Sequence, residues 1–352
     1  MAAITSVEIE NFRCFQKLRV DGLAQVNLIV GANNAGKTVL LEAIEAVVSR
    51  DSPFVLYRAS LERNEYRRHV GPDEDLVEID LRHWFHGHAL TDGASFSIRA
   101  AGEQQFAMSR SLEIVPSDAP SHPFAPEGLW LTTRRPGARA MPSLPLTADG
   151  LLGAGPLSRF NNFGTRLTPP VGFVSTNRLS PRQLARLWTN VVLTPGEQRT
   201  IDALRLIEPK IERIAISEAD STIAKVLLRG ADAPVPLGTL GEGVSRILTL
   251  ALQLALTPRG FLMIDEIENG LHWSVMPKVW RFLIETALAG QTQVFAATHS
   301  KDWLEGLADL HRSNPQLAAH VAVHRLEAGR PTSVRFTAER IAEYVEMEME
   351  AR

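Results

Sequence analysis

The segment 31–38, Gly-Ala-Asn-Asn-Ala-Gly-Lys-Thr, contains the residues with the clearest chemical potential in the chain. It follows the apolar run 26–30 and precedes residues 39–44, whose apolar side chains recur at helical spacing. A glycine-containing loop between a strand and a helix directs backbone N–H groups and the positive end of a helix dipole at phosphate oxygens. The residues expected to bind the phosphates are Asn33, Asn34, Ala35, Gly36, Lys37 and Thr38.

Two side chains of this P-loop have specific predicted roles. Lys37 is expected to reach the β- and γ-phosphates and to act in catalysis, and the Thr38 hydroxyl is expected to ligate Mg²⁺. An accidental glycine turn is the alternative interpretation, and the strand and helix patterns on either side disfavour it. The segment therefore predicts a site for a nucleoside triphosphate, ATP, together with Mg²⁺.

A second apolar run, residues 261–264, ends in two acidic residues, Asp265 and Glu266. Four consecutive apolar residues are typical of a parallel strand that is buried on both faces. Asp265 is expected to hold Mg²⁺ through water, and Glu266 is expected to polarise the attacking water as the general base. Two acids at a strand end are common, so this prediction depends on the P-loop far upstream in the same chain.

Two further segments resemble a known group of ATPases. Residues 11–15, Asn-Phe-Arg-Cys-Phe, resemble the start of RecF, SMC and OLD-type ATPases, which are ABC-class ATPases but not transporters. The resemblance implies that Arg13 lies near the nucleotide; a solvated turn residue is the alternative. Residues 265–272, Asp-Glu-Ile-Glu-Asn-Gly-Leu-His, are a narrower match to OLD-like AAA-type ATPases, in which this D-loop lies across a dimer interface.

The same resemblance assigns three more positions. His299 follows the apolar run 293–297 and matches the switch histidine, which contacts the γ-phosphate and reports hydrolysis. Gly241 and Gly243 lie in Leu-Gly-Glu-Gly-Val, which resembles the ABC signature Leu-Ser-Gly-Gly-Gln and implies N–H groups directed at a nucleotide on a second subunit. Glycine, glutamate and valine replace the usual serine, first glycine and glutamine, which weakens the match. Gln183 is a weaker match to the loop glutamine that senses Mg²⁺.

The fold class that follows is α/β: a P-loop NTPase of the ABC-ATPase type, with a mixed sheet core, an antiparallel β layer and a helical lobe. One two-lobed head is expected over residues 1–352. Its expected parts are the P-loop half (1–50), an antiparallel β region with an irregular Pro- and Gly-rich insertion (51–172), a helical lobe with strands (173–240), the signature, Walker B, D-loop and switch-histidine region (241–326), and a C-terminal strand with an acidic helix (327–352).

The regions between the motifs give weaker local predictions. Strand-like alternation marks residues 76–85, 95–100 and 105–108, whereas residues 50–75 read as surface loop and short helix. Histidines 83, 86 and 88 are either strand-end residues or, less favoured, part of a metal cluster. Residues 115–172 are rich in Pro and Gly and carry no heptads, so no coiled-coil arm is expected. Arg134, Arg135 and Arg139 are interpreted as solvated loop residues, with contact to phosphate or a partner as the alternative.

The composition is that of an ordinary globular protein. The 352 residues are 45% hydrophobic and 22% charged, with a formal net charge of −3, so no overall pull toward nucleic acid is indicated. The single cysteine, Cys14, excludes an intrachain disulfide and is expected to be a packed thiol in a cytoplasmic protein. No apolar run is long enough to cross a membrane, so no membrane partner is expected.

Three functions remain open at this point. The first is an ATPase that dimerises, or forms a higher homo-oligomer, through ATP-sandwiched heads and regulates a separate effector, a nuclease or toxin, in anti-phage defence. The alternatives are a DNA-repair or recombination ATPase, with DNA as a possible partner, and a nucleotide-gated scaffold with little hydrolysis. No second acidic cluster follows His299, so any nucleic-acid cleavage is expected to come from a partner.

Overall fold

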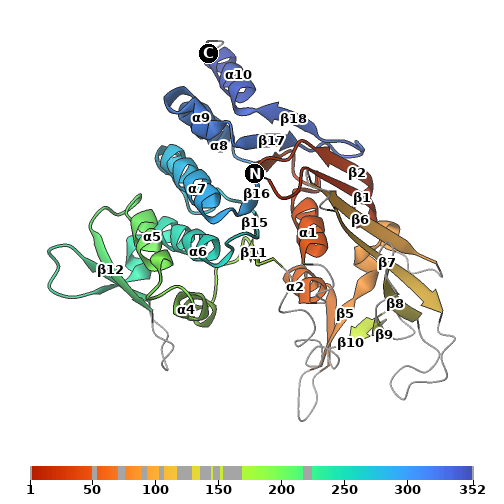
Figure 1. The fold of residues 1–352 in the computed structure, drawn as a ribbon. Coiled ribbons are helices and arrows are strands. Elements are labelled where there is room, and N and C mark those ends of the chain that lie inside the picture. Colours follow the sequence, from red (N-terminus) through yellow and green to blue (C-terminus); the bar gives the residue numbers. More distant parts are fainter. Residues whose placement is uncertain are drawn as a thin grey trace.

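The central element of the computed structural model is a six-stranded sheet with the order β11-β15-β16-β3-β17-β18. The structure describes residues 2–49, 54–69, 76–88, 93–102, 107–116, 129–134, 144–145, 151–153, 169–216 and 224–350 (Figure 1). The sheet comprises β3 (Val26–Val30), β11 (Val171–Val174), β15 (Phe261–Ile264), β16 (Gln293–Ala297), β17 (Val321–Arg325) and β18 (Val334–Thr337). All pairs are parallel except β17 with β18. The carboxyl ends of the parallel strands therefore share one edge.

The central sheet is buried on both faces, which explains the uninterrupted apolar runs in its strands. In β15, Leu262 and Ile264 face a core that includes side chains of α5 (Pro195–Leu204), α6 (Glu242–Leu256), α7 (Met276–Gly290) and α8 (Lys301–Ser313). Phe261 and Met263 face a second core, which includes α1 (Lys37–Val48). Because successive side chains of a strand point to opposite faces of the sheet, the single apolar run of β15 contributes side chains to both cores.

The second core is closed by an antiparallel sheet with the order β2-β1-β6-β7-β8-β9. Helix α1 contacts both this sheet and the central sheet, and Figure 1 shows it between them. The strands are β1 (Ser6–Phe12), β2 (Phe15–Asp21), β6 (Ser95–Ala101), β7 (Ala107–Pro116), β8 (Leu129–Arg134) and β9 (Leu144–Pro145). A smaller sheet has the order β10-β5-β4, with β4 (Tyr66–His69), β5 (Leu76–Asp80) and β10 (Leu151–Gly153). The predicted antiparallel layer is confirmed.

Several local expectations in this layer were wrong. The strand expected over residues 76–85 ends at Asp80, whose side chain accepts a hydrogen bond from the Arg82 N–H and starts the 3₁₀ turn η1 (Leu81–Trp84). A second turn, η2, covers His86–His88. Within residues 50–75, the expected short helix is α2 (Phe54–Glu62), but strand β4 follows it, and the short strands β8, β9 and β10 interrupt the insertion that was expected to be irregular. Cys14 is exposed, because it lies in the two-residue turn between β1 and β2.

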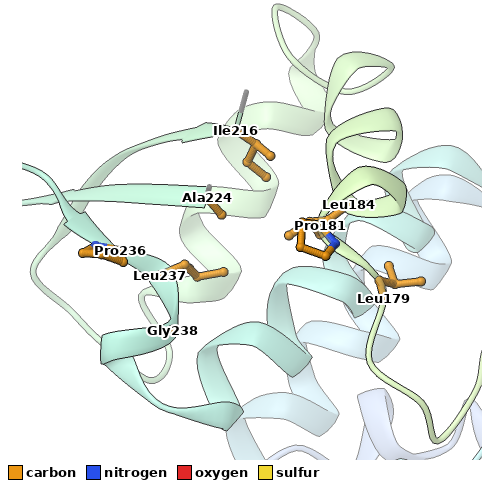
Figure 2. Close-up of a pocket in the computed structure, with 8 residues that line it drawn as sticks. All are labelled: Leu179, Pro181, Leu184, Ile216, Ala224, Pro236, Leu237 and Gly238. Atoms are coloured by element: carbon orange, nitrogen blue, oxygen red, sulfur yellow. The ribbon is translucent and has the colours of Figure 1, made fainter. Parts of the chain in front are cut away.

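The helical lobe contains α4 (Pro181–Thr189), α5, α6, the turn η3 (Leu237–Leu240) and a three-stranded sheet. Its strands are β12 (Ile211–Ile216), β13 (Ala224–Leu228) and β14 (Val235–Pro236). Ser180 caps α4, and Pro181 follows it at the first helical position, a residue order that favours a helix start. A cavity of about 220 Å³ lies between α4 and the small sheet, and Figure 2 shows its lining, including Leu184, Ala224 and Leu237. Its walls are aliphatic, so it offers no charged group for phosphate.

The C-terminal region adds α8, α9 (Pro315–Ala318) and α10 (Ala338–Glu350), and a turn η4 (Trp273–Val275) precedes α7. Figure 1 shows α8, α9 and α10 on the side of β17 and β18. None of the helices among the described residues is both long and apolar enough to span a membrane. The division of the chain into the five parts given above stays a prediction, as does the role of Arg135 and Arg139, which lie outside the described residues.

One buried histidine of the central sheet predicts a pH-dependent stability. His324 in β17 is fully buried, and neither ring nitrogen has a hydrogen-bond partner among the described residues. Burial, with a smaller contribution from the Arg335 charge, lowers the pKa of His324 to about 4. The native imidazole therefore stays neutral while the unfolded chain binds a proton below its ordinary pKa of about 6.5. Stability from this residue is present above pH 6.5 and is lost as the pH falls toward 4, by about 3 kcal/mol in total.

Chemical denaturation of wild type and His324→Leu between pH 7 and pH 4 measures this effect as the difference in free energy of unfolding at each pH. The difference should change by about 3 kcal/mol in favour of the variant as the pH falls. His320→Leu removes an exposed imidazole just before the same strand and is the matched control. Parallel pH profiles for wild type and His324→Leu would contradict the prediction.

Candidate nucleotide-binding site

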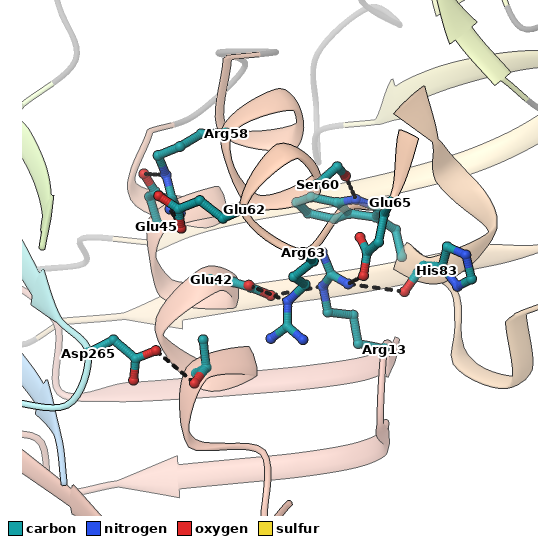
Figure 3. A network of polar contacts seen from close by, with 12 residues as sticks. Arg13, Glu42, Glu45, Arg58, Ser60, Glu62, Arg63, Glu65, His83 and Asp265 are labelled. Carbon is teal, nitrogen blue, oxygen red and sulfur yellow. Dashed lines mark hydrogen bonds and ion pairs between the residues drawn. The ribbon is translucent and has the colours of Figure 1, made fainter. Parts of the chain in front are cut away.

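The predicted P-loop and Asp265, the first acid of the predicted Walker B motif, meet at the edge of the central sheet where the parallel strands have their carboxyl ends. Residues 31–36 connect β3 to α1, and Thr38 lies in the first turn of that helix. Asp265 directly follows β15, two strands away in the sheet. The Thr38 hydroxyl donates a hydrogen bond of 2.9 Å to Oδ2 of Asp265 (Figure 3). Two side chains that are 227 residues apart in sequence are thus brought together, as the motifs predicted.

Lys37 lies over its own loop. Its ammonium group donates to the carbonyl oxygens of Gly31 and Ala32, at 2.9 and 3.0 Å. The loop therefore holds a cation inside a turn of backbone groups at the N-terminus of α1, which is the arrangement that attracts phosphate. The site suits a triphosphate, and the residues predicted to bind it are contiguous on this turn.

Gly36 is required by the shape of the loop. Its φ of 90° lies in the left-handed region, and a Cβ at this position would lie 2.4 Å from the ring of Phe15. Phe15 belongs to β2, so the antiparallel sheet packs directly against the P-loop backbone. Both observations leave glycine as the residue that fits.

Gly36→Ala is expected to weaken ATP binding about tenfold or more, because left-handed backbone strain alone costs about 1–3 kcal/mol. Calorimetry with a slowly hydrolysed ATP analogue measures the dissociation constant. Gly230→Ala is the matched control: Gly230 has a φ of 80°, a Cβ there would meet no atom within 4 Å, and the residue lies in the helical lobe. Wild-type affinity in Gly36→Ala would contradict the prediction.

Asp265 and Thr38 together offer oxygen ligands suited to Mg²⁺. Asp265 is 7% exposed, and burial raises the pKa of its carboxyl, while the hydrogen bond from Thr38 opposes that shift. A buried carboxylate beside a hydroxyl is the donor set that a hard divalent cation prefers. These two residues fit the predicted metal site.

Glu266 adopts an unusual backbone conformation for its residue type. Its φ is 44°, in the left-handed region that disfavours side chains other than those of Asn and Asp. Its carboxylate accepts a hydrogen bond of 2.9 Å from the side chain of Asn269. The side chain is half-buried, so the carboxylate is held in place while remaining accessible to a water molecule. Its role as general base stays a prediction that this geometry supports.

His299 is held by a residue to which the motifs assign no role. Glu268 Oε1 accepts a hydrogen bond from the His299 N–H at 3.0 Å and lies 3.0 Å from the ring Nδ1. The ring itself is 53% exposed at the edge of the sheet where β16 ends. Glu268 thus connects the loop after Glu266 to the predicted switch histidine. Its position two residues after Glu266 in Asp-Glu-x-Glu was the signal available in the sequence.

The signature-like turn packs on the D-loop. Gly241 precedes α6 with a φ of 90°, and Glu242 forms an ion pair of 2.8 Å with Arg178. A Cβ on Gly243 would lie 2.9 Å from the carbonyl oxygen of Gly270, so the two backbones are in close contact. The neighbours of Gly243 are therefore the D-loop and the helical lobe. Contact between the Gly241 and Gly243 amides and a nucleotide stays a prediction.

Arg13 belongs to a buried charge network beneath the P-loop helix (Figure 3). Its guanidinium forms ion pairs of 2.8 and 2.7 Å with Glu42 and Glu65 and lies over the ring of Trp84 at 4.6 Å. Arg63 also donates to Glu42, at 2.7 Å. Arg13 is in the turn between β1 and β2, as the alternative interpretation had it, but it is 5% exposed rather than solvated. The observed contacts give it a packing role, and nucleotide contact stays a prediction.

A second pair on α1 extends this network. Glu45 is buried and pairs with Arg58, which also lies 3.7 Å above the ring centre of Phe173. Burial raises the pKa of Glu45 to about 7, although Arg58 opposes the shift. The glutamates of α1, a helix enclosed by two sheets, therefore form ion pairs with arginines from α2 and from the β1–β2 turn.

Gln183 and the three histidines at positions 83, 86 and 88 have partners within the structure. The Gln183 side chain accepts from the Ser180 N–H in the capping box of α4, and its proposed role in sensing Mg²⁺ stays a prediction. His83 and His88 have ring nitrogens 3.3 Å apart, and His86 donates to the Arg13 carbonyl oxygen. Across the described part of the chain, no group of three or more potential metal ligands is present. The interpretation as strand-end residues was wrong, because β5 ends at Asp80 and the three histidines lie in the turns η1 and η2.

One more residue of the site was missed: Arg246. It is a buried arginine in α6 that donates to the backbone carbonyl oxygens of Asp265 and Glu266. A cation within the otherwise apolar face of a helix was the signal in the sequence, because arginine is rarely buried unless it is paired.

Comparisons with known proteins agree with this geometry. Residues 3–105 match the family model described as "AAA ATPase domain", and residues 193–302 match the one described as "AAA domain, putative AbiEii toxin, Type IV TA system". An "ATP/GTP phosphatase" of Helicobacter pylori is 23% identical over 346 residues, covering 88% of each chain. The "DNA replication and repair protein RecF" of Thermomicrobium roseum is 30% identical over 146 residues, covering 39% of this chain and 36% of the relative.

Two solved structures share the fold. The SMC head bound to the C-terminal winged-helix domain of ScpA has a TM-score of 0.56 at 13% identity, covering 96% of this chain and 99% of that chain. An SMC head with an extended coiled coil, bound to the C-terminal domain of ScpA derived from Pyrococcus furiosus, has a TM-score of 0.54 at 12% identity, with 98% and 99% covered. The predicted fold class is confirmed.

Proposed function

We propose that this chain, an ABC-type AAA ATPase, binds ATP with Mg²⁺ and hydrolyses it in a site completed by a second copy. The observation that carries the proposal is the hydrogen bond between Thr38 and Asp265 at the edge where Glu266 and His299 also emerge. One chain thus supplies the P-loop, the metal ligands and a candidate base. The name of the Helicobacter pylori relative, an ATP/GTP phosphatase, supports the same reaction.

Different residues of the site have different proposed roles in hydrolysis. Backbone N–H groups of residues 33–38 and the Lys37 ammonium would bind the phosphates and stabilise negative charge that develops on them. Glu266, held by Asn269, would accept a proton from the attacking water. His299, held by Glu268, would contact the γ-phosphate. Mg²⁺ on Thr38 and Asp265 would neutralise phosphate charge.

The second copy follows from the position of the signature-like turn. Gly241 and Gly243 stand at the N-terminus of α6 against the D-loop, so their amides would serve a nucleotide other than the one on their own P-loop. A two-fold symmetric pair then forms two sites, each with a P-loop from one copy and a signature turn from the other. ATP is thereby both substrate and part of the interface.

The regulatory output proposed for this ATPase is anti-phage defence through a separate nuclease or toxin, in a cytoplasmic protein. The family model over residues 193–302, whose description names a toxin, supports this output. DNA repair is the second candidate, and the match to RecF favours it. Phage plating on cells that carry the gene with its neighbours, compared with cells that carry Glu266→Gln, separates the two. Protection against phage that is lost in the Glu266→Gln cells supports defence. If plating does not differ but the Glu266→Gln cells are more sensitive to DNA damage than wild-type cells, repair is supported.

The biochemical proposal is tested with the purified wild-type protein. Phosphate release should require both ATP and Mg²⁺, and light scattering after size exclusion should show a dimer that forms with ATP and not with ADP. Absence of turnover with intact ATP binding would overturn the enzymatic interpretation and leave a nucleotide-gated scaffold. A mass that does not respond to ATP would overturn the shared site.

A further inference from the structure

Arg246 is a buried cation in a helix face that is otherwise apolar. It lies in the second turn of α6, is 8% exposed, and is followed by the buried Ile247 and Leu248. In the described part of the chain, no carboxylate accepts a hydrogen bond from its guanidinium; backbone carbonyl oxygens do so instead. A buried guanidinium without a directly bonded carboxylate is costly, which calls for a physical reason for its presence.

The three acceptors come from the ends of two neighbouring strands. Nη1 donates to the Ser175 carbonyl oxygen at 2.9 Å, just after β11. Nη2 donates to the carbonyl oxygens of Asp265 and Glu266, at 2.7 and 2.8 Å, just after β15. These carbonyls lie beyond the sheet ladder, where strand pairing no longer orients them. One side chain of α6 therefore orients the peptide groups on both sides of the Glu266 Cα.

Glu266 needs such support because its backbone is strained. Its φ of 44° is unfavourable for a residue with a side chain, so without external contacts the peptide would relax. Asn269 holds the carboxylate through its side chain and also donates its backbone N–H to the Glu266 carbonyl oxygen, at 3.1 Å. Arg246 binds that same carbonyl oxygen and the preceding one, of Asp265. The planar, forked guanidinium can reach both strand ends at once, which a lysine ammonium cannot do.

The pKa of Arg246 is lowered overall, but an arginine guanidinium stays ionised in proteins. Burial lowers the pKa of Arg246, whereas the carboxylates of Asp265, Glu268 and Glu266 raise it. The guanidinium is thus a fixed positive charge behind the three acids of the site. It offsets part of their mutual repulsion without contacting the space where a nucleotide would bind.

We propose that Arg246 is a positioning residue for ATP hydrolysis: from α6 it holds the backbone of Glu266 so that the carboxylate faces the attacking water. This inference rests on the proposed function, because it assigns Arg246 to the same reaction. It also places the support of the base on the helix whose N-terminus carries Gly241 and Gly243. The support and the signature-like turn therefore belong to one rigid element.

The test compares Arg246→Met and Arg246→Lys with wild type. Arg246→Met is expected to lower kcat about 10–100-fold, the range typical of residues that orient a reacting group, with the dissociation constant for ATP unchanged. Arg246→Lys keeps the charge and the aliphatic stem, so kcat should be intermediate. ATP-dependent dimers of Arg246→Met should persist longer than those of wild type, because hydrolysis rather than binding is impaired. Arg205→Met is the matched control: Arg205 also donates to a backbone carbonyl, that of Ile211, but at the end of α5.

A double-mutant cycle separates positioning from general stability. If Arg246 acts through Glu266, adding Arg246→Met to Glu266→Gln should cause little further loss of kcat. A wild-type kcat in Arg246→Met, or a fully additive loss in the double variant, would overturn the inference. Thermal unfolding accompanies each variant, and Arg246→Lys carries the test if Arg246→Met does not fold. If wild type itself hydrolyses no ATP, the proposed function fails; an active wild type with an equally active Arg246→Met rejects this inference alone.

Discussion

Glu266→Gln is expected to lower kcat for ATP hydrolysis by about 10²–10⁴-fold, the usual contribution of a positioned general base. The amide cannot accept a proton from water, but its oxygen can still accept the hydrogen bond from Asn269. The local geometry is therefore retained, and the affinity for ATP should stay near that of wild type. Phosphate release under single-turnover conditions and calorimetric binding of ATP measure the two quantities separately.

The same variant should accumulate as an ATP-bound dimer, because ATP is part of the proposed interface and is no longer consumed. Glu285→Gln removes an exposed carboxylate from α7 and is the matched control, with wild-type turnover and dimer lifetime. A Glu266→Gln protein that hydrolyses ATP at the wild-type rate would remove Glu266 from the chemistry. A Glu266→Gln protein that loses turnover but does not dimerise on ATP would support Glu266 as the base and contradict the site shared between two copies.

A mixture of two inactive variants is expected to regain activity if each site is shared between copies. Lys37→Ala disables the P-loop side, and Gly241→Asp places a negative charge at the turn proposed to face the γ-phosphate. Gly241 is exposed, and a Cβ there would meet no atom within 4 Å, so the added side chain has room. In an equal mixture, half of the dimers are mixed and one of their two sites is intact, so the rate should reach about one quarter of that of wild type.

Two controls sharpen this experiment. Gly241→Asn has the same shape and the same backbone strain at a φ of 90°, but it lacks the charge and should be much less impaired than Gly241→Asp. Lys37→Ala mixed with Glu266→Gln should show no recovery, since both lesions lie on the P-loop side and every mixed site keeps one of them. Recovery in this second mixture, or none in the first with subunit exchange verified by affinity tags, would contradict a site divided between P-loop and signature turn.

The motifs and their supporting elements could be predicted from the sequence, because each depends on local order along the chain. The P-loop is recognisable from the strand before residue 31 and the helix after residue 38, and α1 (Lys37–Val48) includes the residues 39–44 that showed helical spacing. Asp265 could be placed beside Thr38 because parallel strands end at a common edge. The Ser180–Pro181 pair located the start of α4. These features are determined by periodicity and capping, which single sequences report well.

The partners of side chains could not be predicted in the same way. Arg13 is buried against Glu42 and Glu65, which lie 29 and 52 residues further along the chain, and no spacing rule connects them. Cys14 is exposed because the hairpin turn occupies positions 13 and 14, a boundary that alternation alone does not locate. Asp80 ends β5 early because its side chain caps a 3₁₀ turn. In each case contacts or turn positions that sequence spacing does not reveal decided the outcome.

The supporting residues of the site were missed for a related reason. Glu268 and Arg246 act on the peptide groups and side chains of Asp265, Glu266 and His299, so their roles appear only when the loops are folded together. Both nevertheless left a trace in the sequence: an acid two residues after Glu266, and a cation on an apolar helix face. Such out-of-place charges near a recognised motif are useful markers of residues that orient it.

The Lys37 ammonium, with its two carbonyl contacts at Gly31 and Ala32, makes nucleotide capture an exchange reaction. A triphosphate that binds Lys37 must compete with bonds already formed, so the enthalpy gained from that residue is smaller than the number of new contacts suggests. In return the loop is already folded, and little conformational entropy has to be lost on binding. This exchange favours rapid, reversible binding of ATP, which suits the proposed cycle in which two copies associate on ATP and separate after hydrolysis.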